Sequence, residues 1–219
     1  METWSDSLAV WLTAIGTIGA TVVAVYLAYR SEQQNKQKPK LSIGFRFFPP
    51  DCTLLTESIK SAEAPNEPKR IDAFWFRGFV KNSGRGVARD VEVIIHDILI
   101  RTGDTWKPIP DFISSNLWWT HLPRHNAYLP MILPGTSKNF EIGCILKPKL
   151  DKTWFEFKLT IVPSYKYNVM PPGEYKFTVT VGASNAKPVH QQFELKVTGD
   201  WFESIDSMFE LGVSIKIVS

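Results

Sequence analysis

Cysteine is scarce in this sequence, because Cys52 and Cys144 are the only two among 219 residues. Two thiols so far apart do not form the dense disulfide framework that holds small secreted domains together. Neither belongs to a C-x-x-C pair of the kind found in structural zinc sites and redox centres. The cysteine content therefore predicts a domain that depends on a hydrophobic core, and it suits a cytoplasmic domain with reduced thiols.

The sequence also lacks the short motifs of common enzymes and cofactor sites. It has no G-x-S-x-G nucleophile elbow, no H-E-x-x-H zinc motif and no G-x-x-x-x-G-K-[ST] phosphate loop. His121 and His125 are four residues apart, but Pro123 between them argues against a helix that presents both to a metal. We therefore expect no enzymatic activity, no metal and no cofactor, and a metal hydrolase ranks last among the functional hypotheses.

A strong net charge of either sign is missing. The formal net charge is +3, from 25 basic and 22 acidic residues. Such a small excess allows attraction to an anionic lipid surface, but it is far from the dense basic field of a nucleic-acid-binding domain. With 44% hydrophobic and 13% aromatic residues, the chain has enough apolar side chains to form a folded core.

One long apolar segment is present, residues 8–29, and no charge interrupts its 22 residues. As a helix it would be roughly 33 Å long, enough to cross a hydrocarbon core of about 30 Å. A cleavable signal peptide would have a basic start and a shorter apolar run. A core helix of a soluble domain would have a polar face. We therefore predict an uncleaved signal-anchor, a transmembrane helix within residues 1–30.

The charges that flank this segment predict its orientation. Glu2 and Asp6 precede it, with no Lys or Arg. The basic residues that follow it are Arg30, Lys36, Lys38 and Lys40. Because basic flanks stay on the cytoplasmic side, we expect a single-pass protein of the plasma (inner) membrane with its N-terminus outside. Residues 31–40 then form a polar basic stalk, and residues 41–219 form a cytoplasmic domain.

Small residues recur every four positions along the predicted helix, at Gly16, Ala20, Ala24 and Ala28. A parallel row of hydroxyls lies beside them, at Thr13, Thr17 and Thr21. Small side chains at this spacing let two helix backbones approach closely, and hydroxyls can bond across the contact. The alternative is that Gly and Ala are simply frequent in membrane helices. We expect the helix to pair with itself or with another membrane helix.

After residue 40 the chain is dominated by apolar residues at every second position. The clearest segments are residues 71–81, 88–100, 155–161, 175–181 and 193–197. Their expected buried faces carry Phe74, Phe76, Gly78 and Val80; Val91, Val93 and Ile95; Phe155, Phe157, Leu159 and Ile161; Tyr175, Phe177, Val179 and Val181; Phe193, Leu195 and Val197. This period is typical of strands buried on one face. A mainly β domain, an antiparallel sandwich that ends in a short helix and a last strand, is therefore predicted.

A resemblance supports this fold. Residues 79–95, FVKNSGRGVARDVEVII, resemble a strand-turn-strand passage of prokaryotic immunoglobulin-like domains, which often read V-x-N-x-G-x-x-x-A-x-x-V-x-V. The matching residues are Val80, Asn82, Gly84, Ala88, Val91 and Val93. Residues 133–142 and 171–181 resemble later strands of these domains, in which a Pro-Gly turn leads into an alternating strand. The resemblance implies an Ig-like sandwich and no particular function, because such sandwiches serve many roles.

The segment 111–131 departs from that pattern and is the candidate ligand-binding site. It concentrates Trp118, Trp119, His121, Arg124, His125 and Tyr128. Aromatic faces beside Arg and His can stack a ring and hold a phosphate. The alternative is that the two tryptophans cap an open end of the sandwich or dip into the membrane surface.

Two functional hypotheses rank first. One is a non-enzymatic interaction module, anchored to the bilayer, that oligomerises through its helix and whose sandwich binds a protein or itself, with a small molecule as the alternative partner. The other is a ligand- or nucleotide-sensing effector with the β domain as its sensor, an architecture that resembles some bacterial defence effectors. Nothing in the sequence points directly to a nucleic-acid partner.

Overall fold

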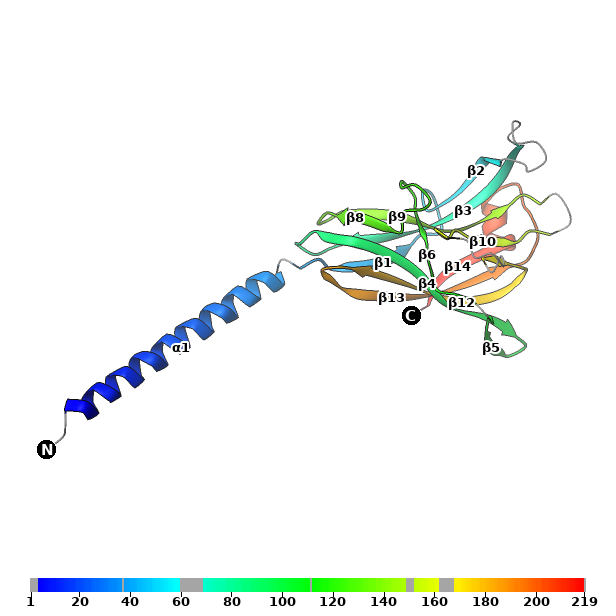
Figure 1. Ribbon diagram of the computed structural model, residues 1–219. Coiled ribbons are helices and arrows are strands. Elements are labelled where there is room, and N and C mark those ends of the chain that lie inside the picture. Colours follow the sequence, from blue (N-terminus) through cyan, green and yellow to red (C-terminus); the bar gives the residue numbers. More distant parts are fainter. Residues whose placement is uncertain are drawn as a thin grey trace. The chain divides into compact units, whose positions relative to one another are not determined.

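The computed structural model describes residues 4–36, 38–59, 69–110, 112–148, 152–161 and 168–218 (Figure 1). The chain divides into two compact units, Met1–Lys38 and Pro39–Ser219. The first is helical and the second is built from two antiparallel sheets. The predicted fold class, mainly β with one N-terminal apolar helix and a β-sandwich, is confirmed.

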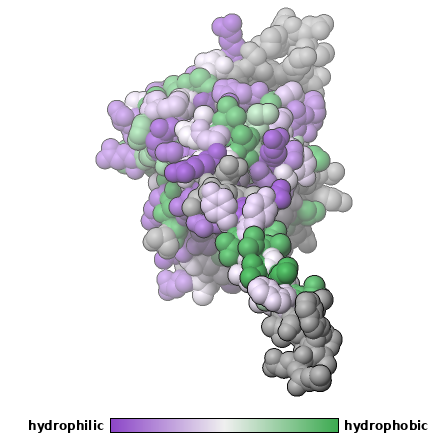
Figure 2. All heavy atoms as spheres, turned by 90° about the vertical axis from the view of Figure 1, so that its left-hand side faces the viewer, coloured by the Kyte–Doolittle hydropathy of each residue, from purple (hydrophilic) through white to green (hydrophobic). Residues whose placement is uncertain are grey.

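The helix α1 spans Trp4–Lys36. Within the described part of the chain, its segment Trp11–Glu32 is the one helix long and apolar enough to span a membrane. The apolar side chains of this segment are exposed, for example Leu12 at 63% and Ile18 at 64%, and Figure 2 shows hydrophobic residues on the helix surface. A helix that is apolar all round needs an apolar environment on every side.

Sheet A contains seven strands. They are β1 (Leu41–Phe45), β2 (Cys52–Ile59), β3 (Lys69–Asn82), β7 (Trp118–Trp119), β9 (Ser137–Leu146), β10 (Phe155–Phe157) and β11 (Val169–Met170). The long strand β3 lies at its centre: β1 and β2 pair with successive halves of one edge, and β9 pairs with the other. On its far side, β9 pairs with β7 and β10.

Sheet B also contains seven strands. They are β4 (Ala88–Thr102), β5 (Thr105–Pro108), β6 (Ser115–Asn116), β8 (Tyr128–Ile132), β12 (Gly173–Ala183), β13 (Ala186–Val197) and β14 (Val213–Val218). The strand order is β14-β13-β12-β4, and β5, β6 and β8 all pair with the remaining edge of β4. The predicted helix before the last strand is a short turn, α2 (Ile205–Ser207), followed by a π-helical turn, η1 (Met208–Gly212).

The two sheets share one core between their inner faces. Phe157 of sheet A meets Phe177 of sheet B edge to face, with ring centroids 5.1 Å apart. Almost every position that alternation assigns to the core is buried. Ile161 is the exception, since it is 78% exposed. The reason is that β10 ends at Phe157 and only a single bridge, from Leu159 to Leu117, continues the pairing.

A bulge in β4 decides which residues reach the outer face of sheet B. Asp97 has a φ of +52°, and the register with β12 shifts between Lys176 and Thr178. Asp tolerates this left-handed conformation better than most residues, and one extra residue reverses the alternation. Val91, Val93 and Ile95 before the bulge are buried, and after it the buried residue is Ile98. Arg101 consequently points away from the core.

Candidate functional site

The two tryptophans of β7 face opposite sides of sheet A, as neighbours in a strand must. Trp119 is 3% exposed and packs in the core, with its ring centroid 6.3 Å from that of Phe140. Trp118 lies on the outer face, where its indole N–H donates to the carbonyl of Leu159. The candidate site therefore divides at this pair, with one ring facing the core and one facing outward.

Cations cover the outward tryptophan. The guanidinium carbon of Arg124 lies 4.4 Å from the centroid of the Trp118 ring. The ammonium of Lys158 lies 5.7 Å from the same centroid and 5.0 Å from the ring of Trp75. Lys158 is itself 7% exposed, so its stem is packed against the sheet. These contacts fix the segment onto sheet A through cation–π interactions.

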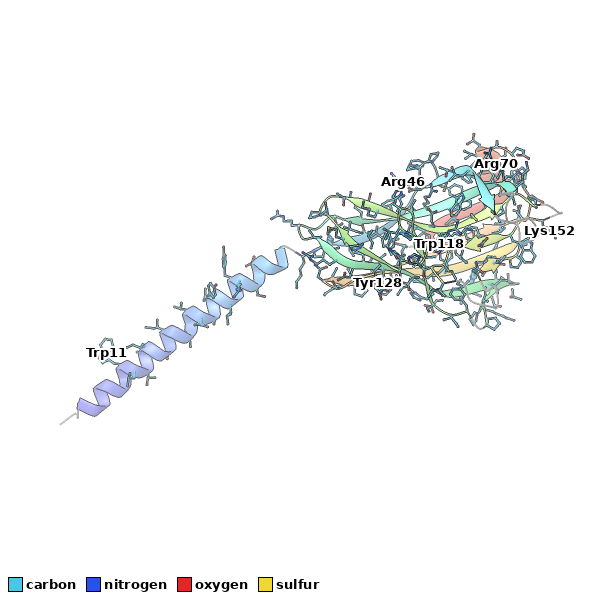
Figure 3. The ribbon with its side chains drawn as sticks, turned by 45° about the horizontal axis from the view of Figure 1, so that its top comes forward. Trp11, Arg46, Arg70, Trp118, Tyr128 and Lys152 are labelled. Atoms are coloured by element: carbon cyan, nitrogen blue, oxygen red, sulfur yellow. The ribbon has the colours of Figure 1, made fainter. Side chains whose placement is uncertain are left out.

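The other candidate residues are dispersed. His121 and His125 are exposed in the turn after β7, and Tyr128 is 58% exposed on β8, paired with Glu92 in sheet B. Figure 3 labels Trp118 and Tyr128 on these separate elements. The structure thus brings Trp118 and Arg124 together and places Trp119 and Tyr128 elsewhere. Ligand binding by the segment stays a prediction.

The small residues of the helix lie on an open surface. A Cβ atom added at Gly16 would meet nothing within 4 Å. The hydroxyls of Thr17 and Thr21 each donate 2.9 Å hydrogen bonds to the carbonyl four residues earlier, at Thr13 and Thr17. These hydroxyl protons are used within the helix, so in any helix–helix contact the two oxygens serve as acceptors.

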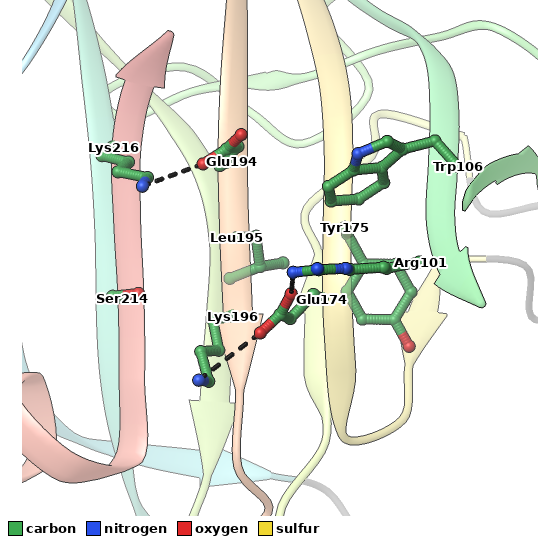
Figure 4. Close-up of a pocket in the computed structure, with 9 residues that line it drawn as sticks. All are labelled: Arg101, Trp106, Glu174, Tyr175, Glu194, Leu195, Lys196, Ser214 and Lys216. Atoms are coloured by element: carbon green, nitrogen blue, oxygen red, sulfur yellow. Dashed lines mark hydrogen bonds and ion pairs between the residues drawn. The ribbon is translucent and has the colours of Figure 1, made fainter. Parts of the chain in front are cut away.

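A hollow on the outer face of sheet B was not anticipated from the sequence. It has a volume of about 280 Å³, and Figure 4 shows the residues that line it. They belong to β4, β5, β12, β13 and β14. Its lining residues are Arg101, Trp106, Glu174, Tyr175, Glu194, Leu195, Lys196, Ser214 and Lys216. The bulge at Asp97 is what turns Arg101 toward this face.

Two carboxylates organise the cations of the hollow. Glu174 accepts from Nη1 of Arg101 at 2.7 Å and lies 3.4 Å from the ammonium of Lys196. Glu194 lies 2.9 Å from the ammonium of Lys216 and 3.1 Å from that of Lys176. Each carboxylate therefore bridges two cations on neighbouring strands, which fixes the positions of the positive groups.

The same contacts shift the ionisation of these groups. The hydrogen bond from Arg101, helped by Lys196, lowers the pKa of Glu174. The bond from Lys216, helped by Lys176, lowers the pKa of Glu194. Both carboxylates are therefore ionised at neutral pH, and the hollow carries full charges of both signs.

Trp106 forms the aromatic wall of the hollow. It lies on β5, which pairs with the end of β4, and is half-buried. The ammonium of Lys176 lies 4.5 Å from its ring centroid. The ammonium covers one face of the indole, so the site combines positive charge with a tryptophan whose other face is not covered by Lys176.

A second polar cluster on this face connects three strands. His96 lies between Asp97 and Thr180, with Nδ1 2.8 Å from the carboxylate and Nε2 2.7 Å from the hydroxyl. The same Thr180 hydroxyl lies 2.7 Å from Nδ1 of His190. Because two imidazoles share it, the hydroxyl bridges strands rather than standing free as a nucleophile. Among the described residues, no three His, Cys, Asp or Glu side chains form a potential metal site.

No protein-family model matches the chain, and no curated protein matches its sequence.

Proposed function

We propose that the protein is a single-pass membrane protein whose β-sandwich is a non-enzymatic binding module on the cytoplasmic face of the plasma membrane. The observation that carries the proposal is the helix segment Trp11–Glu32, which is apolar and exposed along its length. Inside a bilayer a helix satisfies its own backbone hydrogen bonds while its apolar side chains face lipid. Exposed to water, the same surface would be a strong aggregation liability.

The cytoplasmic placement of the sandwich rests on flanking charge. Arg30, Lys38 and Lys40 follow the apolar segment, whereas the residues before it include Glu2 and Asp6. Retention of basic flanks on the cytoplasmic side supports an outside N-terminus. The basic residues also lie where the anionic headgroups of the inner leaflet would attract them.

Fractionation of the full chain tests the anchor. After cell lysis we expect the protein in the membrane pellet, resistant to alkaline carbonate and released only by detergent. A matched variant with Ile18→Arg and Val22→Arg should leave the pellet, because each arginine at a helix centre costs about 2.5–3.5 kcal/mol on insertion. Full-length wild-type protein in the carbonate supernatant would contradict the proposal.

A second function, a ligand-sensing membrane effector, is favoured by the hollow of sheet B. A small molecule in that hollow would be held by residues of neighbouring strands, whereas the candidate residues of segment 111–131 lie on separate elements. In this scheme ligand binding to the sandwich would alter how the membrane helices pair. A ligand-dependent change in cross-linking between helices would support sensing, and unchanged cross-linking with a bound ligand would leave the simpler binding module.

A further inference from the structure

We propose that the hollow on the outer face of sheet B binds a small ligand that combines a phosphate group with a flat ring, with a nucleoside monophosphate as the representative. The inference deepens the proposed binding function by naming a site and a ligand class. It rests on that function only in treating the sandwich as a binding module. The membrane anchor is tested separately, by fractionation.

Positive and negative side chains meet at the hollow. Arg101, Lys196 and Lys216 line it, and Lys176 lies beside it. Glu174 and Glu194 pair with these cations. Two further carboxylates lie nearby, Asp104 near Arg101 and Glu210 in an adjoining hollow with Lys196 and Ser214. The charges of this group therefore balance, and what favours a phosphate is that the cations come from opposite sides of the hollow. A phosphate entering between them would be attracted from both sides.

Arg101 has hydrogen-bond donors to spare for a ligand. A guanidinium has five N–H groups. In Arg101, Nη1 donates to Glu174 and Nε donates to the carbonyl of Gly103 at 3.2 Å. Its Nη2 has no partner among the described residues. Arg is well suited to phosphate oxygens because its planar donors match their spacing. The exposed hydroxyl of Ser214 lies in the same lining.

An aromatic ring lies at one side of the hollow. Trp106 and Arg101 reach the hollow from β5 and β4, on the side opposite Lys216 and Ser214 of β14 (Figure 4). A ligand whose phosphate lies among the cations therefore has its ring beside an indole. Stacking of a flat ring on Trp is favourable for every nucleobase. Because the ammonium of Lys176 lies over one face of the indole, the ligand ring would displace it there or stack on the other face.

The volume of the hollow limits the size of its ligand. At about 280 Å³ it is just below the range of roughly 300–1,000 Å³ that is usual for pockets that bind small molecules. Such a volume matches a single small ligand better than a polymer, and the lining residues come from β4, β5, β12, β13 and β14. We therefore infer a mononucleotide-sized ligand rather than a nucleic-acid strand.

Calorimetric titration of the detergent-purified full chain tests the proposal with AMP, adenosine and inorganic phosphate as probes. We expect AMP to bind, and to bind at least tenfold more tightly than either phosphate or adenosine. Raising the salt concentration should weaken AMP binding, because the attraction is electrostatic. If AMP shows no binding at millimolar concentration, or binds no better than adenosine, the proposal is wrong.

Variants separate the roles of the lining residues. Arg101→Gln and Lys216→Gln should each weaken the binding of AMP at least fivefold. The side chain of Lys216 is 70% exposed, so its replacement does not endanger folding. Trp106→Leu should lower the affinity for AMP to the affinity for inorganic phosphate. The matched control is Lys187→Gln, an exposed position of β13 outside the hollow, and it should bind AMP like the wild type. AMP affinity that is unchanged in all three lining variants would overturn the assignment.

Discussion

The side-chain amide of Asn82 donates a hydrogen bond of 3.1 Å to the backbone carbonyl of Ile132. This bond joins β3 of sheet A to β8 of sheet B within the buried interior. The same amide nitrogen also donates to Gly86 at 2.7 Å. The side-chain oxygen accepts from the backbone N–H groups of Lys40 at 3.1 Å and Gly84 at 3.0 Å. One fully buried residue thus fixes the first strand, a hairpin turn and a contact between the sheets.

Replacing this hub by an apolar side chain should destabilise the domain. Asn82→Leu leaves two backbone carbonyls and two N–H groups without their partner, and we expect a loss of about 2–4 kcal/mol. Thermal unfolding followed by circular dichroism measures the loss as a lower Tm. The control is Ser83→Ala. The exposed hydroxyl of Ser83 makes one hydrogen bond of 3.3 Å, and its removal should lower the free energy of unfolding by less than about 0.5 kcal/mol. Equal Tm values for the two variants would show that the hydrogen bonds of the Asn82 side chain do not stabilise the domain.

The adjacent tryptophans of β7 should respond differently to mutation. Trp119→Ala empties a core position and should cost about 3–5 kcal/mol. Arg124→Ala removes a partly exposed cation–π contact to Trp118 and should cost about 1 kcal/mol or less. Denaturant titration of both variants measures the difference. A Trp119→Ala variant as stable as Arg124→Ala would mean that Trp119 is not a core residue.

The sequence was sufficient for the sandwich because alternation depends on local geometry alone. At Tyr175, Phe177 and Val179 every predicted core residue is fully buried, since side chains of a strand point to alternate faces. In β3 the prediction of the buried face is correct even at Gly78, where the ring of Phe140 fills the space that a Cβ would occupy.

The hollow of sheet B could not be predicted from the sequence, because it depends on strand pairing and on one bulge. Glu174 and Lys196 are 22 residues apart, yet they are register partners across β12 and β13. Arg101 shares the odd-numbered positions of Val91 and Val93, so alternation alone would have placed it in the core. A positive φ at Asp97 is not encoded by any periodicity. The aromatic and basic residues of segment 111–131 made it the candidate site, but in the fold its aromatic rings lie on two separate strands, β7 and β8.

Buried protonated groups should make the domain sensitive to alkali. Burial raises the pKa of the Cys52 thiol to about 12, from an ordinary value of 9.0. Burial likewise raises the pKa of Tyr175 to about 12, and its hydroxyl donates to the carbonyl of Pro171. Because both pKa values are higher in the folded chain, unfolding releases protons in this range. The stabilisation is complete below about pH 9 and is lost as the pH rises toward 12.

Thermal unfolding at pH 8 and pH 11 measures this effect. We expect Tm to fall between these values, and to fall less in Cys52→Ala. Both cysteines are fully buried, so Ellman's reagent should label neither thiol at pH 8 before denaturant is added. Rapid labelling of the native protein would contradict the burial of these thiols.

Pairing of the membrane helix should depend on its small-residue face. Gly16→Leu together with Ala20→Leu places bulk where close approach needs small side chains, so cross-linked dimers in membranes should decrease severalfold. The matched control is Ile18→Leu with Val22→Leu on the opposite face, which should leave cross-linking unchanged. If both double variants cross-link like the wild type, the small-residue face does not mediate pairing.

Protease accessibility in oriented membrane vesicles decides on which side of the membrane the sandwich lies. A tag at the C-terminus reports on the sandwich, which we expect on the cytoplasmic side of a single apolar helix. In inside-out vesicles, protease should remove the tag, and in sealed right-side-out vesicles the tag should stay protected until detergent is added. Loss of the tag in right-side-out vesicles, with inside-out vesicles protected, would contradict the orientation; full-length chain that fails to sediment with either would contradict the anchor itself.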